Sequence, residues 1–157
     1  MRTGAFAGLA AVVLLAACAE KTQVATRPPS GYVQDVGAQV AAADWSKARS
    51  QTVKLDEFSF APENLVFERG QPYRLNLENI GQRSHTFTSE GFFKDIAVRR
   101  VTTPQSTIET PALVNLDVPA HQTYVVEFVP VAAGTFDLEC DKPLHSTFGM
   151  TGKITVR

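Results

Sequence analysis

The sequence predicts an all-β fold, an antiparallel sandwich or barrel that follows a short N-terminal linker and helix. From Gln51 onward apolar and polar residues alternate, as around Val53 and Leu55 and around Leu65 and Phe67, which is the period of a strand with one buried face. The turn-forming stretches RGQP, NIGQ, VPAH and PVAAG separate these segments. Several short strands divided in this way are typical of sandwiches and barrels.

Further strands are predicted near the C-terminus, at Thr123–Val129, Gly134–Cys140 and Lys153–Arg157. The stretch from Phe92 to Val118 is less regular. Within it, FFKDIA predicts a helical turn and TTPQSTIETPA predicts a loop.

We expect the first 17 residues to be a signal peptide. Arg2 supplies the positive start, and the apolar run from Ala5 to Ala17 is too short for a permanent membrane span. The stretch LAAC, which ends at Cys18, resembles the lipobox of bacterial lipoproteins, in which the leader is cut before a cysteine that carries the lipids. This resemblance implies a lipid anchor on Cys18 in the periplasm or cell envelope, at the outer membrane of a two-membrane bacterium. The alternative is an ordinary leader with a chance cysteine.

Residues 18–50 are expected to link this anchor to a domain at 51–157. Positions 19–34 are polar and carry Pro28, Pro29, Ser30 and Gly31, the composition of a linker. The alanine-rich stretch DVGAQVAAADWSKARS predicts a short helix, and we expect Trp45 to pack this segment onto the domain.

Charge and cysteine usage restrict the function. The chain has 15 basic and 16 acidic residues, a near balance that argues against a nucleic-acid partner. With Cys18 lipidated, Cys140 has no partner for an internal disulfide, because the chain has only two cysteines. A lone thiol in an exported protein is protected when it binds a metal.

Four side chains that can bind a metal are predicted to converge at one end of the sandwich. In GTFDLEC, Cys140 shares the apolar strand face with Leu138, and in SHTFTS, His85 also points inward. Met150 lies at the mouth of the last strand, and His145 lies in the loop between Cys140 and Met150.

One thiolate, two imidazoles and a thioether are the ligands of a mononuclear blue-copper site. A structural zinc ion would require four strong ligands, and methionine is a poor one. A binuclear copper centre would need a second cysteine in this loop, and multicopper enzymes need more histidines than the three present. The sequence therefore predicts one copper per chain and no enzymatic activity.

These residues resemble the cupredoxins, the family of plastocyanin, azurin and rusticyanin. The C-terminal pattern of the family, Cys-x-x-Pro-Gly-His-x-x-x-Gly-Met-x-Gly-x-Ile-x-Val, is matched by Cys140, Pro143, His145, Gly149, Met150, Gly152, Ile154 and Val156. The first ligand of the family, an inward His after a strand that ends in Asn and Gly, corresponds to His85 after LNLENIGQRS. The resemblance covers about residues 51–157, is closest to the rusticyanin-like type, and implies a Greek-key β-sandwich with His85, Cys140, His145 and Met150 as copper ligands.

Two residues depart from the family pattern. Leu144 stands where the family has Gly, so we expect that corner of the loop to avoid a positive φ. Thr86 follows the first His where plastocyanins and azurins often have an Asn that bridges the two ligand loops, so we expect a weaker bridge or none.

Other interpretations of the same residues remain open. Each of three residues has a plausible structural role when taken alone: Cys140 as a buried thiol, His145 as a loop residue and Met150 as a core residue. A nucleophilic Cys–His pair is the enzymatic alternative, but it lacks an evident orienting Asn or Asp and gives Met150 no role. His121, in the turn PAHQT, is expected to be a solvated surface residue rather than a ligand.

The resemblance implies a lipid-anchored, monomeric electron carrier that exchanges electrons with proteins such as cytochromes or oxidases. The alternative is a protein for copper storage, delivery or tolerance with the same site. His145 is expected to reach the surface through its ring edge. Around it, the apolar Pro143, Leu144 and Phe148 are expected to form a small contact surface for a redox partner.

Overall fold

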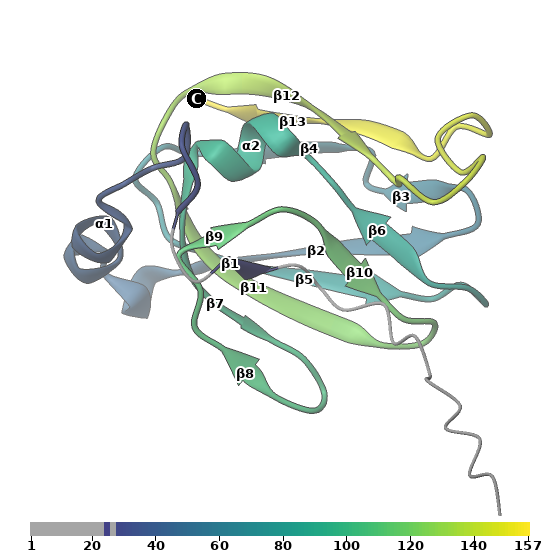
Figure 1. Ribbon diagram of the computed structural model, residues 1–157, viewed down its shortest axis with the longest axis horizontal. Coiled ribbons are helices and arrows are strands. Elements are labelled where there is room, and N and C mark those ends of the chain that lie inside the picture. The colour runs from purple at the N-terminus through teal and green to yellow at the C-terminus, as the bar shows by residue number, and fades with distance from the viewer. Residues whose placement is uncertain (1–23, 26–27) are drawn as a thin grey trace, which may run out of the picture.

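The computed structural model of this chain describes residues 24–25 and 28–157 (Figure 1). The predicted signal peptide and the predicted lipidation site, Cys18, lie outside these residues. Among the helices that are described, none has the length and apolar character needed to cross a membrane.

Strands are the main regular elements of the described residues, which also form two short α-helices and one 3-10 turn. In chain order the elements are β1 (Val24–Ala25), α1 (Val36–Ala42), the 3-10 turn (Trp45–Lys47), β2 (Arg49–Asp56), β3 (Ser59–Ala61), β4 (Asn64–Phe67), β5 (Tyr73–Asn79), β6 (His85–Phe87), α2 (Glu90–Lys94), β7 (Ile96–Thr102), β8 (Thr107–Ile108), β9 (Ala112–Leu113), β10 (Leu116–Val118), β11 (Thr123–Pro130), β12 (Gly134–Glu139) and β13 (Thr151–Val156).

Two main sheets form the layers of a sandwich, which confirms the predicted all-β fold (Figure 1). The larger sheet has the strand order β3-β2-β5-β11-β7-β8, and the smaller one has the order β12-β13-β4. The pairs β10-β6 and β1-β9 complete the structure. Because β12 leads into the loop at 140–150, that loop projects from one end of the sandwich, at the right in Figure 1.

The sheets are not wholly antiparallel as predicted. Strands β2 and β5 pair in parallel, as do β13 and β4. The physical reason is the route of the chain: after β3 it leaves the larger sheet to form β4 in the smaller sheet, and then returns as β5. Such a passage supplies the crossover that a parallel pair requires.

Strand β7 was not predicted, because its residues lie in the stretch expected to be irregular. It is nevertheless an interior strand of the larger sheet, between β11 and β8. The pairing shifts at this point: Glu127 lies opposite Arg100, while Phe128 lies opposite Val98. Arg99 is therefore the extra residue of a β-bulge, which breaks the alternation that sequence analysis relies on. The predicted helical turn at FFKDIA corresponds to α2, and the predicted loop after β7 contains the short strand β8.

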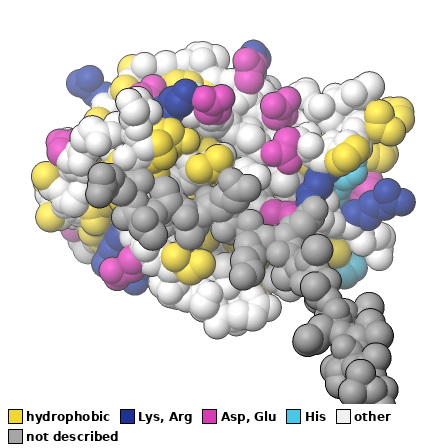
Figure 2. Space-filling view, viewed as in Figure 1, with side chains coloured by type: hydrophobic (Ala, Val, Ile, Leu, Met, Phe, Trp, Pro, Cys, Tyr) yellow, Lys and Arg dark blue, Asp and Glu magenta, His cyan; other side chains and the backbone are white. Residues whose placement is uncertain are grey.

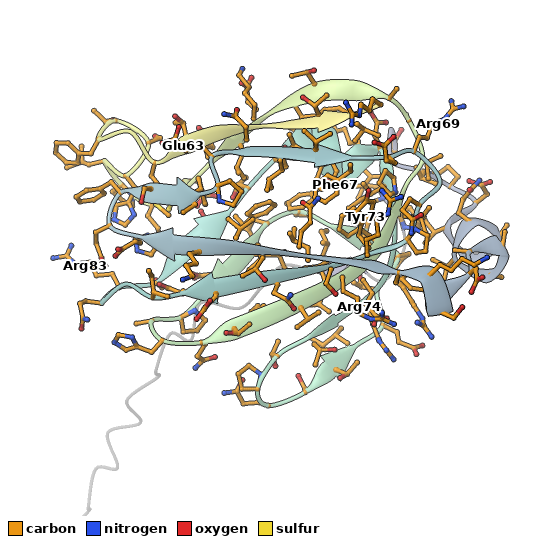
Figure 3. All side chains as sticks on the ribbon, turned by 180° about the vertical axis from the view of Figure 1, so that it is seen from behind. Glu63, Phe67, Arg69, Tyr73, Arg74 and Arg83 are labelled. Atoms are coloured by element: carbon orange, nitrogen blue, oxygen red, sulfur yellow. The ribbon has the colours of Figure 1, made fainter. Side chains whose placement is uncertain are left out.

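Aromatic side chains fill the space between the sheets. Phe67 and Tyr73, which point into the interior in Figure 3, have ring centroids 4.8 Å apart in an edge-to-face arrangement. Phe92 of α2 stacks on Phe67 with centroids 5.5 Å apart. Burial of large rings in such pairs contributes strongly to stability, so these contacts hold the two sheets together.

The segment expected to be a linker and helix contacts the domain. Strand β1 pairs with β9, and the helix predicted in the alanine-rich stretch is present as α1, with Val36 buried. The Arg99 guanidinium lies over the Trp45 ring, 4.6 Å from its centroid, a cation–π contact that attaches this segment to β7.

Candidate metal centre

His85 begins β6 and is completely buried. The turn before it is fixed by Asn79, the last residue of β5. The Asn79 side-chain amide donates to the carbonyl oxygens of Arg83 and Val118, both at 2.8 Å, and its side-chain oxygen accepts a hydrogen bond from the Gly81 N–H. Asn79 therefore satisfies backbone groups that the turn would otherwise leave unpaired, and in doing so it sets the position of His85.

Cys140 follows β12 and is a free, completely buried cysteine. Its N–H donates to the Met150 carbonyl at 3.1 Å, and the Met150 N–H donates to the His145 carbonyl at 3.0 Å. These two hydrogen bonds close the loop at 141–149 on itself. Met150 is completely buried at the end of this loop.

The corner of this loop differs from the prediction. Leu144 has a φ of 70°, in the left-handed region, so the expectation that Leu in place of Gly avoids a positive φ is wrong. The turn itself requires this conformation: the Leu144 carbonyl accepts a hydrogen bond from the Phe148 N–H at 3.0 Å, and His145 must point inward while Leu144 is 63% exposed. Leu144 therefore holds a conformation that costs a non-glycine residue about 1 kcal/mol or more.

The bridge between the two ligand segments is also present, contrary to expectation. The Thr86 hydroxyl donates to an Asp141 carboxylate oxygen at 2.7 Å and accepts from the Asp141 N–H at 2.8 Å. The Thr86 N–H lies 3.3 Å from the Cys140 sulfur, and its hydroxyl lies 3.6 Å from the same atom. A hydroxyl both donates and accepts, so Thr can replace the two polar functions of an Asn side chain here.

Three of the predicted ligands lie together in the structure. The Nδ1 atoms of His85 and His145 are 3.1 Å apart, and the Cys140 sulfur is 3.4 Å from Nδ1 of His145. All three donor atoms lie within 4.8 Å of one another. The predicted axial ligand, Met150, is buried at the end of the same loop.

The chemistry of these donors fits one copper ion. A thiolate with two imidazole nitrogens is the trigonal set of a blue-copper site, and a methionine sulfur is its weak axial ligand. Burial lowers the pKa of His85, which the nearby Glu57 carboxylate only partly offsets, so the ring is neutral at neutral pH. A neutral imidazole is the form that binds a metal.

Glu57, in the turn between β2 and β3, is a site residue that sequence analysis missed. Its Oε1 atom lies 3.4 Å from Nε2 of His85, on the side of the ring away from Cys140 and His145. The same oxygen accepts hydrogen bonds from the N–H groups of Gln82 at 2.9 Å and Arg83 at 3.0 Å. Burial raises the pKa of the Glu57 carboxyl, but a side-chain hydrogen bond with Asp56 and these backbone donors outweigh it and hold the pKa below its usual range.

The predicted contact residues Pro143, Leu144 and Phe148 are all exposed, the last two at 63% and 61%. Hydrophobic side chains gather at this end of the molecule in Figure 2. Phe58 joins them: its ring lies 5.2 Å from that of Phe148 and packs edge-on against His145 at 5.1 Å. His145 is consequently only 6% exposed, so less of its ring edge reaches the surface than expected.

Two further residues are placed by the structure. Lys142 forms an ion pair with Asp117 at 2.9 Å, which ties the loop to β10. His121 is exposed in the turn before β11, as expected, and is not among the residues that converge on this centre.

Comparison with known proteins supports the fold. A search of curated protein sequences found no significant match. Among solved structures, auracyanin B is 20% identical, with 73% of this chain and 93% of that chain aligned at a TM-score of 0.51. A dithionite-reduced auracyanin from Roseiflexus castenholzii is 15% identical, with 70% and 98% aligned at a TM-score of 0.51.

A multicopper oxidase from Campylobacter jejuni is also similar, at 11% identity and a TM-score of 0.57. The match covers 73% of this chain but only 31% of the oxidase, so the chain spans about a third of that enzyme's length. At these identities the structural matches show the fold alone. The sequence itself matches the family profile of the cupredoxin-like domain over residues 8–156. The chain therefore belongs to the family of cupredoxin-like domains.

Proposed function

We propose that this protein carries single electrons, using one copper ion held by His85, Cys140, His145 and Met150. The observation that carries the proposal is the convergence of two imidazole nitrogens and one thiol sulfur, all from buried residues, within 4.8 Å of one another. When bound, copper supplies a one-electron couple between Cu(II) and Cu(I). The chain's own residues hold the donors in place and exclude water.

The rigidity of the donors favours electron transfer over copper handling. His85 and Cys140 are completely buried, and His145 is 6% exposed. Their positions are fixed by Asn79, by Thr86 and by the hydrogen bonds that close the loop at 141–149. A site that cannot rearrange lowers the cost of changing the oxidation state, whereas a storage or delivery protein needs ligands that exchange.

The exposed apolar side chains of Pro143, Leu144 and Phe148 support the proposed docking of a redox partner such as a cytochrome or an oxidase. Leu144 directly precedes His145 in the chain and is 63% exposed, so a short covalent route leads from His145 to this surface. Redox encounters use small interfaces, for which a patch of this kind is suited. The proposed carrier acts as a monomer and is not itself an enzyme.

We also propose that the carrier is anchored by lipid on Cys18 in the periplasm or cell envelope, at the outer membrane in a two-membrane bacterium. The support is the sequence LAAC and the polar stretch that follows it. Fractionation of cells that express Cys18→Ser tests this: a variant that stays membrane-bound and is processed normally contradicts the anchor.

The experiment that tests electron transfer cycles the copper-loaded protein between a reductant and an oxidant in the presence of a Cu(I) chelator. An electron carrier retains one copper per chain and a constant signal over many cycles. A delivery or storage protein loses copper to the chelator when it is reduced. Stopped-flow reduction by a c-type cytochrome then compares wild type with Leu144→Asp, which should react more slowly although its spectrum is unchanged. Equal rates would exclude this face as the docking surface.

A further inference from the structure

Nε2 of His85 is a buried polar atom for which the described residues provide no well-aligned hydrogen-bond partner. The ring is completely buried, so water does not reach it from bulk. The polar group that faces this atom is the Glu57 carboxylate, whose Oε1 lies 3.4 Å away. A buried ring nitrogen with a single facing carboxylate is the arrangement that fixes the tautomer of metal-binding histidines in other proteins.

Glu57 is itself held in place by the backbone of the turn before His85. The N–H groups of Gln82 and Arg83 donate to Oε1, so the carboxylate cannot turn away from the ring without giving up two hydrogen bonds. Gly81 provides the space, since a Cβ at this position would lie 2.7 Å from Oε2 and 2.9 Å from Oε1. The turn at 81–83 therefore both binds the Glu57 carboxylate and leaves room for it.

We propose that Glu57 is the positioning residue of the metal centre: it keeps the His85 proton on Nε2, leaves Nδ1 free for the metal, and lowers the reduction potential through its negative charge. The observed geometry has Nδ1 of His85 facing His145 and Cys140, as this tautomer requires. A fixed anion close to the metal stabilises the more highly charged Cu(II), and solvent screens this effect in part because the Glu57 side chain is 27% exposed.

A simpler role for Glu57 is to cap the Gln82 and Arg83 N–H groups, with no effect on the metal. The two roles differ in what a neutral isostere does. In Glu57→Gln, the amide oxygen still accepts from the backbone donors, but the charge is gone. A capping role predicts an unchanged potential in this variant, whereas the positioning role predicts a higher one.

The potential measurement rests on the proposed function, so a second measurement uses the metal-free protein. Nitrogen NMR of its histidine rings should show His85 protonated on Nε2 in wild type and in Glu57→Gln. In Glu57→Ala, which removes the acceptor, the ring should no longer hold this single tautomer. If wild-type His85 carries its proton on Nδ1, or if Glu57→Ala leaves the tautomer unchanged, the proposal is overturned even when copper binding is established.

The potential measurement compares copper-loaded wild type, Glu57→Gln and Glu139→Gln. Glu139 is the matched control, because it is exposed, precedes Cys140 and lies on the opposite strand face. Glu57→Gln should keep the wild-type spectrum and show a higher potential, with a shift larger than that of Glu139→Gln. A shift no larger than that of the control contradicts the charge effect. If the copper-loaded wild type shows no visible absorption band, the proposed function is contradicted. The NMR measurement on the metal-free protein still tests the role of Glu57 in that case.

Discussion

Thr86 is the residue that joins the first histidine to the cysteine loop. Its hydroxyl makes both hydrogen bonds to Asp141, and its backbone N–H faces the Cys140 sulfur at 3.3 Å. Hydrogen bonds to a copper-bound thiolate tune the reduction potential, because they withdraw electron density from the sulfur and so favour Cu(I). The hydroxyl, 3.6 Å from the sulfur, gives its proton to Asp141, so it acts on the sulfur by holding the Thr86 N–H against it.

Replacing Thr86 by Val removes the hydroxyl at nearly constant volume. We expect Thr86→Val to lower the reduction potential and to destabilise the fold by about 1–3 kcal/mol, since the Asp141 N–H loses its acceptor. Voltammetry and chemical unfolding measure the two effects. Thr86→Ser, which keeps the hydroxyl, is the control and should resemble wild type in potential. Equal potentials in the Val and Ser variants would show that the hydroxyl does not act on the sulfur.

Among the elements, the parallel pair β13–β4 depends on a glycine. A Cβ on Gly152 would lie 2.2 Å from the Glu63 carbonyl oxygen, which accepts a hydrogen bond from the Lys153 N–H at 2.9 Å. Because the obstructing atom belongs to the backbone, the two strands must separate before a side chain fits. The family pattern predicted a glycine here, and the close approach of β4 is its physical cause.

We therefore expect Gly152→Ala to destabilise the protein by about 1–3 kcal/mol, the usual cost of overpacking. Gly37→Ala in α1 is the matched control: nothing lies within 4 Å of its Cβ, and alanine favours a helix by about 0.5–1 kcal/mol. Denaturant unfolding should show opposite signs for the two variants. An unchanged denaturation midpoint in Gly152→Ala would mean that β4 can move away from β13 without loss of stability.

Some elements could be predicted from the sequence and others could not, for identifiable reasons. Strand β5 buries every second residue, and β12 alternates between more and less exposed residues. Strand β11 alternates at its start and is buried on both faces from Val126 onward. All three were predicted. Strand β7 escaped prediction because the bulge at Arg99 shifts its pattern. The parallel pairs also escaped, because alternation indicates which face is buried but not which strands are neighbours.

The same distinction applies to the metal centre. Short spacing in one loop revealed Cys140, His145 and Met150, and the residues before His85 matched the family pattern. Glu57 and Phe58 lie far from these residues in the sequence, and only the fold brings their turn against His85 and His145. The φ of Leu144 was predicted wrongly because the requirement of the turn outweighs the preference of the residue.

A cluster of charged side chains on the larger sheet, away from the metal centre, contributes to the stability of the fold. Glu127 is buried on β11 and forms hydrogen bonds with Arg74, Arg99 and Arg100 at 3.0–3.1 Å. Arg74 lies toward the end of the molecule opposite Arg83, which projects at the end that bears the metal centre (Figure 3). Burial raises the pKa of Glu127, but hydrogen bonds from Arg100 and Arg74 and the arginine charges outweigh it and hold the pKa below its ordinary value of 4.5.

Glu127→Gln leaves three arginines without their shared counter-charge. We expect a loss of about 1–3 kcal/mol, less than for a fully buried ion pair because the arginines are about one third exposed. Since the folded-state pKa is depressed, this stability is present above the ordinary value of 4.5 and is lost as the pH falls through the folded value. Unfolding measured from pH 7 to pH 3 should show the wild type and the variant converging at low pH. A difference that does not depend on pH would mean that packing, not charge, is responsible.

In the proposed metal centre, Cys140 binds a copper ion through its thiolate, together with His85, His145 and Met150. The most direct test is the optical spectrum of the copper-loaded protein, recorded before and after reduction, for wild type and Cys140→Ser. We expect one copper per chain and an intense visible band in the oxidised wild type that disappears on reduction. Cys140→Ser should lack this band, because thiolate-to-copper charge transfer produces it. A wild-type protein that stays colourless with copper bound, or a serine variant with the same band, would contradict the assignment.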